Sequence, residues 1–366
     1  MLNSLKSPVN TIFIMLGEKC NFNCKYCMQH ATEGLHVDLP QEINPDIFEF
    51  IDTMQSRREK NVDMQLGLHF YGGEPLLYFD KIQEIVKKTK DMYIHYSFIS
   101  NGYAITEEMV DFFNEHDFTE VISWDGSASA NTRRIDVFSI PEKKKILFKL
   151  NRLGVSAVHS AFTSPIQLLN DFQKLSDEYE QIHQYPMYTN IDELFDTGVS
   201  DRDLFYIDFE KVSNEMKQLI TEYDNHMRNG SENKFSAKDD YIRRTINRID
   251  SNLDKNHRIM CSCGNGYSTI NLDLGGTLYS CHNSSDILGT IYDRPEYLLN
   301  QLFQYDKTIL FEETCKKCPV QCICHNGCKL MTEKVREESY CKLKKAVFLP
   351  VVQYVLSFAD KKETKK

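Results

Sequence analysis

The 366-residue sequence predicts an α/β fold, either an open doubly wound sheet or a partial (β/α)6 TIM-like barrel, followed by a small cysteine-rich C-terminal domain. Two observations lead to this prediction. Strand-like apolar runs alternate with helix-period stretches, which is typical of a parallel sheet covered by helices. The twelve cysteines fall into two groups near opposite ends of the chain, so the smaller domain is expected at the C-terminus.

The predicted strands are short runs rich in apolar and β-branched residues. They lie at Thr11–Leu16, Gln65–Tyr71, Tyr93–Ser100, Val121–Trp124, Val155–Phe162 and near Gln184–Tyr188. Helix-period stretches between them predict helices at Asp46–Met54, Phe79–Lys88, Thr106–Glu115, Lys143–Leu153 and Ile166–Tyr179. Ligands of such sheets bind at the carboxyl ends of the strands, so we expect the functional residues there.

Changes in composition divide the chain into four parts. We expect the barrel in residues 1–199 and a charged helical connector in 200–257, with a turn at the Asn-Gly-Ser of 229–231. Residues 258–345 contain nine of the twelve cysteines and form the small domain. Residues 346–366 form a C-terminal helix with a lysine-rich tail.

Charge and hydropathy exclude several classes of partner. The 43 basic and 53 acidic residues give a net charge of −10, which disfavours binding to a phosphate backbone. No apolar run is long enough for a signal peptide or a membrane span. We therefore expect a cytoplasmic protein that binds neither nucleic acid nor membrane. The cytoplasm keeps thiols reduced, so the cysteines point to metal binding or catalysis.

The first cysteine group has the spacing C-x3-C-x2-C and consists of Cys20, Cys24 and Cys27, directly after the first predicted strand. Three thiolates can hold three irons of a 4Fe-4S cubane and leave the fourth iron open to a ligand. A zinc site would need a fourth protein ligand, which His30 could supply.

This group, with an aromatic residue before its third cysteine, resembles the signature of radical S-adenosylmethionine (SAM) enzymes. The resemblance implies that the open iron binds the amino and carboxylate groups of SAM and that Tyr26 packs near its adenine. Reductive cleavage of SAM in this family yields a 5′-deoxyadenosyl radical, which abstracts a hydrogen atom from the substrate. An external electron donor of the flavodoxin or ferredoxin type is then required.

Further motifs follow the next three predicted strands. Gly72-Gly73-Glu74-Pro75 resembles the family's segment that receives the SAM ammonium group, and two glycines let a backbone approach a ligand closely. A plain strand-to-helix turn is the alternative for this segment.

Ser100 and Asn101 resemble the family's segment that binds the ribose and carboxylate of SAM. Asp125 and Arg133, after the fourth predicted strand, complete the cofactor-binding set by the same resemblance. Asp125 and Tyr188 are also our candidates for catalytic proton removal or substrate contact near the barrel lumen.

The second cysteine group resembles the seven-cysteine SPASM pattern of peptide-modifying and protein-modifying radical SAM enzymes. The resemblance implies two auxiliary 4Fe-4S clusters and thus three clusters in all. The first would be held by Cys263, Cys281 and Cys328, with Cys261 as a candidate fourth ligand, and the second by Cys315, Cys318, Cys324 and Cys341. Cys322 is left over. A double zinc-binding module is the alternative for this region.

Together the resemblances imply an enzyme that matures a peptide or protein substrate. The expected product is a thioether or carbon-carbon crosslink in a ribosomally made peptide. Formylglycine formation on a sulfatase is the alternative reaction, and a non-catalytic iron-sulfur or zinc scaffold is the alternative class. Only 19 residues precede Cys20, too few for a winged-helix leader-binding domain, so we expect the connector or a separate leader-binding protein to recognise a leader.

Overall fold

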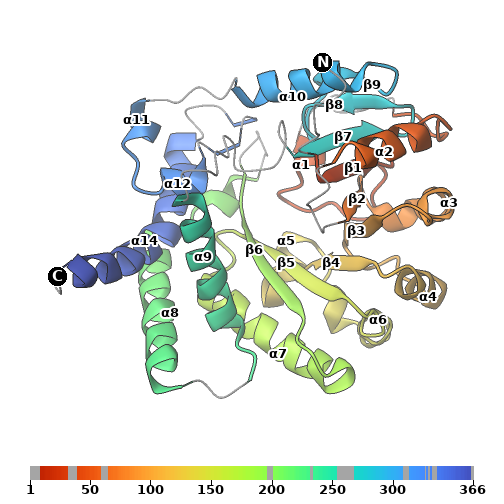
Figure 1. Ribbon diagram of the computed structural model, residues 1–366. Helices are drawn as coiled ribbons and strands as arrows, with labels where there is room; N and C mark the ends of the chain where they lie inside the picture. The colour runs from red at the N-terminus through yellow and green to blue at the C-terminus, as the bar shows by residue number, and fades with distance from the viewer. Residues whose placement is uncertain are drawn as a thin grey trace.

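The computed structural model describes residues 9–31, 39–58, 65–195, 201–230, 234–253, 268–307, 313–325, 327–328, 330–331 and 336–363. Within these ranges one nine-stranded sheet has the order β6-β5-β4-β3-β2-β1-β7-β8-β9 (Figure 1). Its strands are β1 Thr11–Met15, β2 Leu66–Tyr71, β3 Ile94–Ser100, β4 Thr119–Ser123, β5 Leu153–His159, β6 Tyr188–Glu193, β7 Thr269–Asp273, β8 Thr277–Tyr279 and β9 Ile287–Thr290.

The first six strands are parallel and pair in chain order. They curve into a partial barrel. The barrel is not closed, because β6 stands at one edge of the sheet and β1 is followed by β7 instead of β6. The helices between them are α1 Met28–Ala31, α2 Ile47–Ser56, α3 Phe79–Thr89, α4 Glu107–Glu115, α5 Ser129–Thr132, α6 Pro141–Leu147 and α7 Pro165–His183. The predicted fold class, an α/β partial barrel, is confirmed.

Short 3-10 turns follow several strands and redirect the chain toward the next helix. They are η2 Pro75–Tyr78, η3 Gly126–Ala128, η4 Val137–Ser139 and η5 Arg202–Phe205. The core lies between the sheet and its outer helices, where alternate strand residues meet the apolar helix faces. Aromatic rings fill its centre, among them the fully buried Phe70, Phe98, Phe113 and Phe118.

The C-terminal cysteine-rich region begins as an extension of the barrel sheet. Strand β7 pairs in parallel with β1, with Ile12 opposite Ile270, and β8 and β9 continue the sheet in antiparallel fashion. The remaining elements are α10 Pro295–Lys307, α11 Glu313–Lys316, α12 Gln321–Cys324, the π-helix η6 Arg336–Tyr340 and α14 Cys341–Glu363. The sequence did not predict strands in this region.

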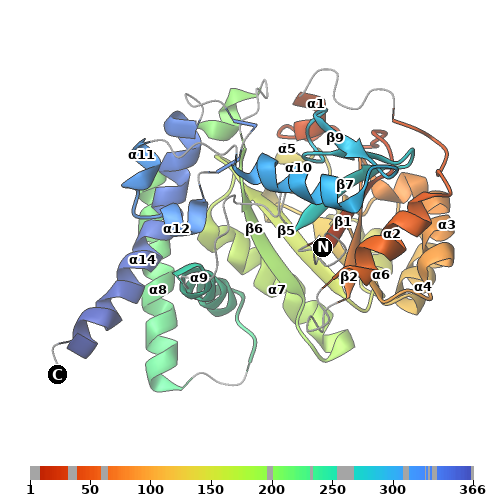
Figure 2. The same cartoon turned by 45° about the horizontal axis from the view of Figure 1, so that its top comes forward.

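The described residues of the predicted connector form two long helices, α8 Phe209–Asn229 and α9 Ala237–Leu253. Asp208 accepts a hydrogen bond from the Lys211 backbone amide and caps the start of α8. Gly230 ends the same helix with a φ of 74°, a conformation that favours glycine. Figures 1 and 2 show α8, α9 and α14 side by side, so the connector and the C-terminal helix pack as one group.

Two predicted elements are shifted along the chain. The run Gln184–Tyr188 is not a strand, because α7 continues to His183 and ends with Gln184 in the left-handed region. Strand β6 therefore begins at Tyr188 instead of ending there. The predicted helix at Lys143–Leu153 ends at Leu147 in the structure. No helix in the described part of the chain is long and apolar enough to cross a membrane.

Candidate functional site

The loop that carries the first cysteine group is fixed by the Gly-Gly-Glu-Pro segment after β2. Gly73 donates its backbone amide to the Gly17 carbonyl at 2.9 Å, and Glu74 donates to the Lys19 carbonyl at 2.9 Å. A Cβ atom added to Gly73 would lie 2.3 Å from the Lys19 oxygen, far closer than any real contact. The approach therefore requires glycine, and it sets the position of the adjoining Cys20.

The thiols of Cys20, Cys24 and Cys27 share this loop and are each partly buried. Burial, together with the charges of Cys27 and Cys20, raises the pKa of the Cys24 thiol to about 11. The Arg133 guanidinium acts in the opposite direction. Thiols packed together in this way ionise only beside a compensating cation, so the donor set fits an iron-sulfur cluster.

Asp125 lies at the centre of a buried network beside this loop. One carboxylate oxygen accepts hydrogen bonds from the Tyr26 hydroxyl and the Thr132 hydroxyl, both at 2.5 Å. The other accepts from the Val158 backbone amide at 2.9 Å. Arg133 completes the network, with its Nε 3.2 Å from the carboxylate. Asp125 is fully buried, so these groups orient one another.

Arg133 connects this network to the cysteines. Its Nη1 lies 4.0 Å from the Cys24 sulfur, and its guanidinium lies 5.0 Å from the centre of the Tyr26 ring. The carboxylate of Asp125 raises the pKa of Arg133 although burial opposes this. The structure thus brings Tyr26, Asp125, Arg133 and Cys24 together around a fixed positive charge.

Glu74 joins the motifs at the ends of β2 and β3. Its carboxylate accepts hydrogen bonds from the Leu76 amide at 3.0 Å, the Ser100 hydroxyl at 2.6 Å and the Asn101 amide at 2.8 Å. Burial raises the pKa of Glu74, and these hydrogen bonds offset only part of the rise. Pro75 follows as the first residue of η2, where its missing amide costs nothing. Gly72, Gly73, Glu74 and Pro75 therefore form one rigid corner with Ser100 and Asn101.

Tyr188 lies away from these residues, which corrects its expected position. It is the first residue of β6 and stands at the amino end of the strand, whereas the motifs follow carboxyl ends. Its side chain is 51% exposed, and Arg244 lies 5.1 Å from its ring. The expected position was wrong because the strand is shifted along the chain. A strand that ended at Tyr188 would have placed its ring at the carboxyl end, where the motifs lie.

The residues that occupy the carboxyl end of β6 are Asp192 and Glu193, which the sequence prediction missed. Asp192 accepts a hydrogen bond from the Ser156 hydroxyl at 2.7 Å and one from Asn190 at 2.9 Å. Val155 is fully buried against the helices, so the neighbouring Ser156 and its partner Asp192 face the barrel lumen. The alternation of polar residues in 188–193 is the signal that could have located them.

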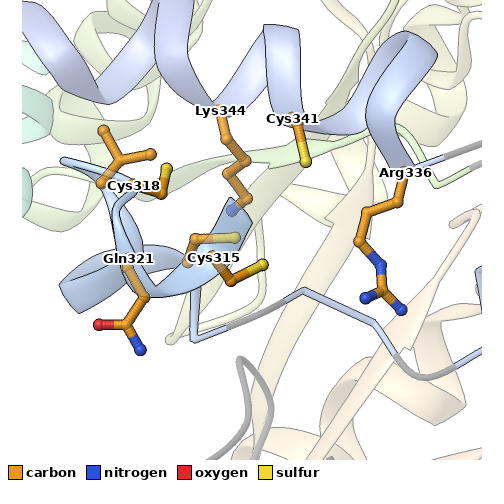
Figure 3. Close-up of a pocket in the computed structure, with 8 residues that line it drawn as sticks. Cys315, Cys318, Gln321, Arg336, Cys341 and Lys344 are labelled. Atoms are coloured by element: carbon orange, nitrogen blue, oxygen red, sulfur yellow. The ribbon is translucent and has the colours of Figure 1, made fainter. Parts of the chain in front are cut away.

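Four cysteines of the second group line one pocket, shown in Figure 3. Lys344 and Arg336 are the basic residues in its wall. Burial, together with the charges of Cys324, Cys315 and Cys318, raises the pKa of the Cys341 thiol to about 11. The four are the set that the SPASM resemblance assigns to one cluster: Cys315, Cys318, Cys324 and Cys341.

Among the described residues, no group of three or more His, Cys, Asp or Glu side chains is arranged to hold a metal ion. The thiolates of a cubane bind four different irons and stand farther apart than the ligands of one ion. Four thiols around a shared pocket with basic residues in its wall therefore fit a cubane.

The other cysteines occupy different places. Cys281 is buried after β8, where its charge and that of Cys27 both raise the pKa of Tyr71. Cys328 lies near Tyr340, whose pKa is raised by burial and by Glu193, Cys324 and Cys328. The predicted ligands Cys261 and Cys263 lie outside the described residues, as does the side chain of Cys322. The grouping of Cys263, Cys281 and Cys328 stays a prediction.

Comparisons with known proteins bear on the family and the fold of the chain. The model of the radical SAM superfamily matches residues 14–165. The radical SAM cyclopropyl synthase TigE of Paramaledivibacter caminithermalis is 22% identical over 341 residues, which cover 89% of this chain and 69% of TigE. The serine-type anaerobic sulfatase-maturating enzyme of Bacteroides thetaiotaomicron is 23% identical over 243 residues, which cover 64% of this chain and 53% of that enzyme.

The fold agrees with that of a solved structure, native anSMEcpe with bound AdoMet. The TM-score is 0.68 at 20% identity, and the match covers 96% of this chain and 99% of anSMEcpe. The same protein has been solved with AdoMet and the Cp18Cys peptide, with a TM-score of 0.67 at 20% identity and coverage of 96% and 99%. Residues 14–165, which contain the three-cysteine loop and the strand-end motifs, form a radical SAM domain.

Proposed function

We propose that this chain is a radical SAM/SPASM enzyme that modifies a side chain of a peptide or protein. The observation that carries the proposal is the pairing of two sites in one fold. Three partly buried thiols lie at the carboxyl ends of the barrel strands, and four more line a pocket in the cysteine-rich region. In this proposal residues 1–199 form the catalytic barrel and residues 258–345 the SPASM domain.

In the first site, Cys20, Cys24 and Cys27 would hold a 4Fe-4S cluster. SAM, when bound to the open iron of that cluster, supplies the 5′-deoxyadenosyl radical. The protein residues bind and orient: the corner of Glu74, Ser100 and Asn101 holds two strand ends in register. Arg133 places a fixed charge beside Cys24, and Asp125 holds Arg133 in place.

In the SPASM domain, we assign one auxiliary cluster to Cys315, Cys318, Cys324 and Cys341 and a second to Cys263, Cys281 and Cys328, with Cys261 as the candidate fourth ligand. The electron for SAM cleavage would come from an external donor of the flavodoxin or ferredoxin type. Recognition of a leader, where the substrate has one, would involve the helical connector or a separate partner.

A peptide substrate is supported by the likeness to anSMEcpe, a protein solved with a bound peptide. We favour a thioether or carbon-carbon crosslink as the product. Formylglycine formation is the second candidate, because the likeness to anSMEcpe covers nearly the whole chain. A crosslink removes two hydrogen atoms from the peptide, whereas formylglycine introduces an aldehyde that a hydrazine probe captures. Mass spectrometry of a co-expressed peptide therefore separates the two reactions.

The basic proposal is tested by iron content and SAM cleavage. Anaerobically reconstituted protein should hold about twelve irons with equal sulfide, as expected for three cubanes. Replacement of Cys20, Cys24 and Cys27 by alanine should leave about eight irons and abolish 5′-deoxyadenosine formation under dithionite. Zinc with little iron in protein purified without oxygen, and no SAM cleavage, would support a scaffold protein instead.

A further inference from the structure

The end of β6 places two consecutive carboxylates on opposite faces of the strand. Asp192 bonds to Ser156 on the lumen face. Glu193 instead meets α14 of the cysteine-rich region, where its Oε1 lies 2.5 Å from the ammonium of Lys344. This ion pair joins the barrel directly to the pocket of the four cysteines.

Lys344 is held in the pocket wall with little freedom. Its side chain is 2% exposed, and its ammonium lies 5.3 Å from the ring of Tyr340 and 4.9 Å from that of Phe348. Figure 3 shows the side chain reaching from α14 into the pocket between Cys318 and Cys341. A cation buried in this way is weakly screened by solvent, so its field acts strongly on the neighbouring sulfurs.

The two members of the pair act on the same thiol with opposite sign. Burial is the main cause that raises the pKa of Cys324, the charge of Lys344 lowers this pKa, and the charge of Glu193 raises it. Burial raises the pKa of Glu193, but Lys344, aided by the charge of Arg248, more than offsets it, so the pKa of this carboxyl lies below its usual range. Glu193 is therefore an anion that partly cancels the field of Lys344 at the pocket.

We propose that the Lys344–Glu193 pair sets the reduction potential of the cluster held by Cys315, Cys318, Cys324 and Cys341. This inference rests on the proposed function, since it needs a cluster in the pocket. Four thiolates and a cubane carry net negative charge, and reduction adds another. A buried cation stabilises the reduced state and raises the potential, while the paired carboxylate moderates the rise. Both are positioning residues and bind no iron.

The test is a redox titration of the reconstituted full chain, followed by electron paramagnetic resonance. Lys344→Met should lower the reduction potential of one cluster by at least 59 mV. This shift corresponds to a tenfold change in the equilibrium constant of a one-electron reduction. Glu193→Gln should raise the potential of the same cluster. The double variant should fall between them, and Lys344→Arg should stay near the wild type because it keeps the charge.

Lys342→Met is the matched control, because Lys342 is an exposed lysine of the same helix and solvent screens its charge. It should shift the potential less than Lys344→Met. Shifts of equal sign in Lys344→Met and Glu193→Gln, or no shift in either, would overturn the inference. If Lys344→Met loses its iron, the reduction potentials of Glu193→Gln and Lys344→Arg still test the inference. Wild-type protein without the expected iron would overturn the proposed function, and with it this inference.

Discussion

The two cysteine groups differ in what holds them in place. The first follows β1, an interior strand between β2 and β7, and its loop is fixed by backbone hydrogen bonds to Gly73 and Glu74. The second depends on α11 and α12, helices of four residues each, and on the first turn of α14. One-turn helices have no stability of their own. The barrel thus preorganises the first site, whereas we expect the second to depend on bound metal for its shape.

Removal of metal should give the largest contrast between the two regions. After chelation of iron under anaerobic conditions, we expect residues 313–328 to become sensitive to proteases while the barrel strands stay protected. Limited proteolysis with mass spectrometry measures this. The variant without Cys20, Cys24 and Cys27 is the control and should stay resistant in 313–328. Equal protection of both regions without metal would show that the second site is also preorganised.

Gly73→Ala should damage the first site alone. The new Cβ would lie 2.3 Å from the Lys19 oxygen and 2.4 Å from the Glu18 oxygen, so the cysteine loop must move. We expect a loss of about four irons and of SAM cleavage, with the auxiliary clusters retained.

Gly230→Ala is the matched control for this substitution. It also replaces a glycine, but its Cβ would meet open space, so only the cost of its positive φ remains, about 1 kcal/mol. Full iron content and normal SAM cleavage in Gly73→Ala would contradict the role of this close approach.

Glu120→Gln should stabilise the barrel without affecting either cysteine site. Burial raises the pKa of Glu120 to about 9, and the charge of Arg152 offsets only part of the rise. A raised pKa favours the protonated folded state, so stability is lost as the pH rises from the unfolded pKa toward 9. Glutamine carries no charge and so avoids this loss. We therefore expect the free energy of unfolding to rise by about 3 kcal/mol at pH 7.

Urea unfolding at pH 5 and pH 8 measures the effect, which should be small at the lower pH and large at the higher. Glu107→Gln is the control, because that carboxylate is exposed and pairs with Lys149. Its substitution should change stability little at either pH. A gain in Glu120→Gln that is equal at both pH values would contradict the buried charge as its cause.

Tyr188→Phe should have the smallest effect. The hydroxyl stands at the amino end of β6 on an exposed side chain, away from the motifs at the carboxyl ends. We expect unchanged iron content, SAM cleavage and product formation. A strong loss of product at normal SAM cleavage would instead show that Tyr188 has the substrate-contact role first predicted for it.

Much of the barrel was predictable because its signals are local. The strands that end near Tyr71 and Ser100 stand within a residue or two of the prediction, since alternation of apolar residues marks them. The placement of Tyr188 failed because α7 continues to His183, beyond the predicted helix end at Tyr179, and helix ends carry weak signals.

The second region was predictable only in the spacing of its cysteines. The four cysteines that the SPASM resemblance assigns to one cluster line one pocket, but the basic wall of that pocket did not follow from the motif. Lys344 and Glu193 are 151 residues apart, and nothing in the local sequence of either indicates the other. The pairing of β7 with β1 is non-local in the same way.

That pairing has a consequence for the order in which the chain can fold. Strand β1 finds its first neighbour in β2, but its second, β7, leaves the ribosome about 250 residues later. At typical rates of synthesis this delay lasts roughly 12 to 50 seconds. During that time one edge of β1 has unpaired backbone groups next to Cys20, a template for pairing with other chains. A chaperone or early assembly of the cluster on the nascent chain would protect that edge until Thr269 arrives.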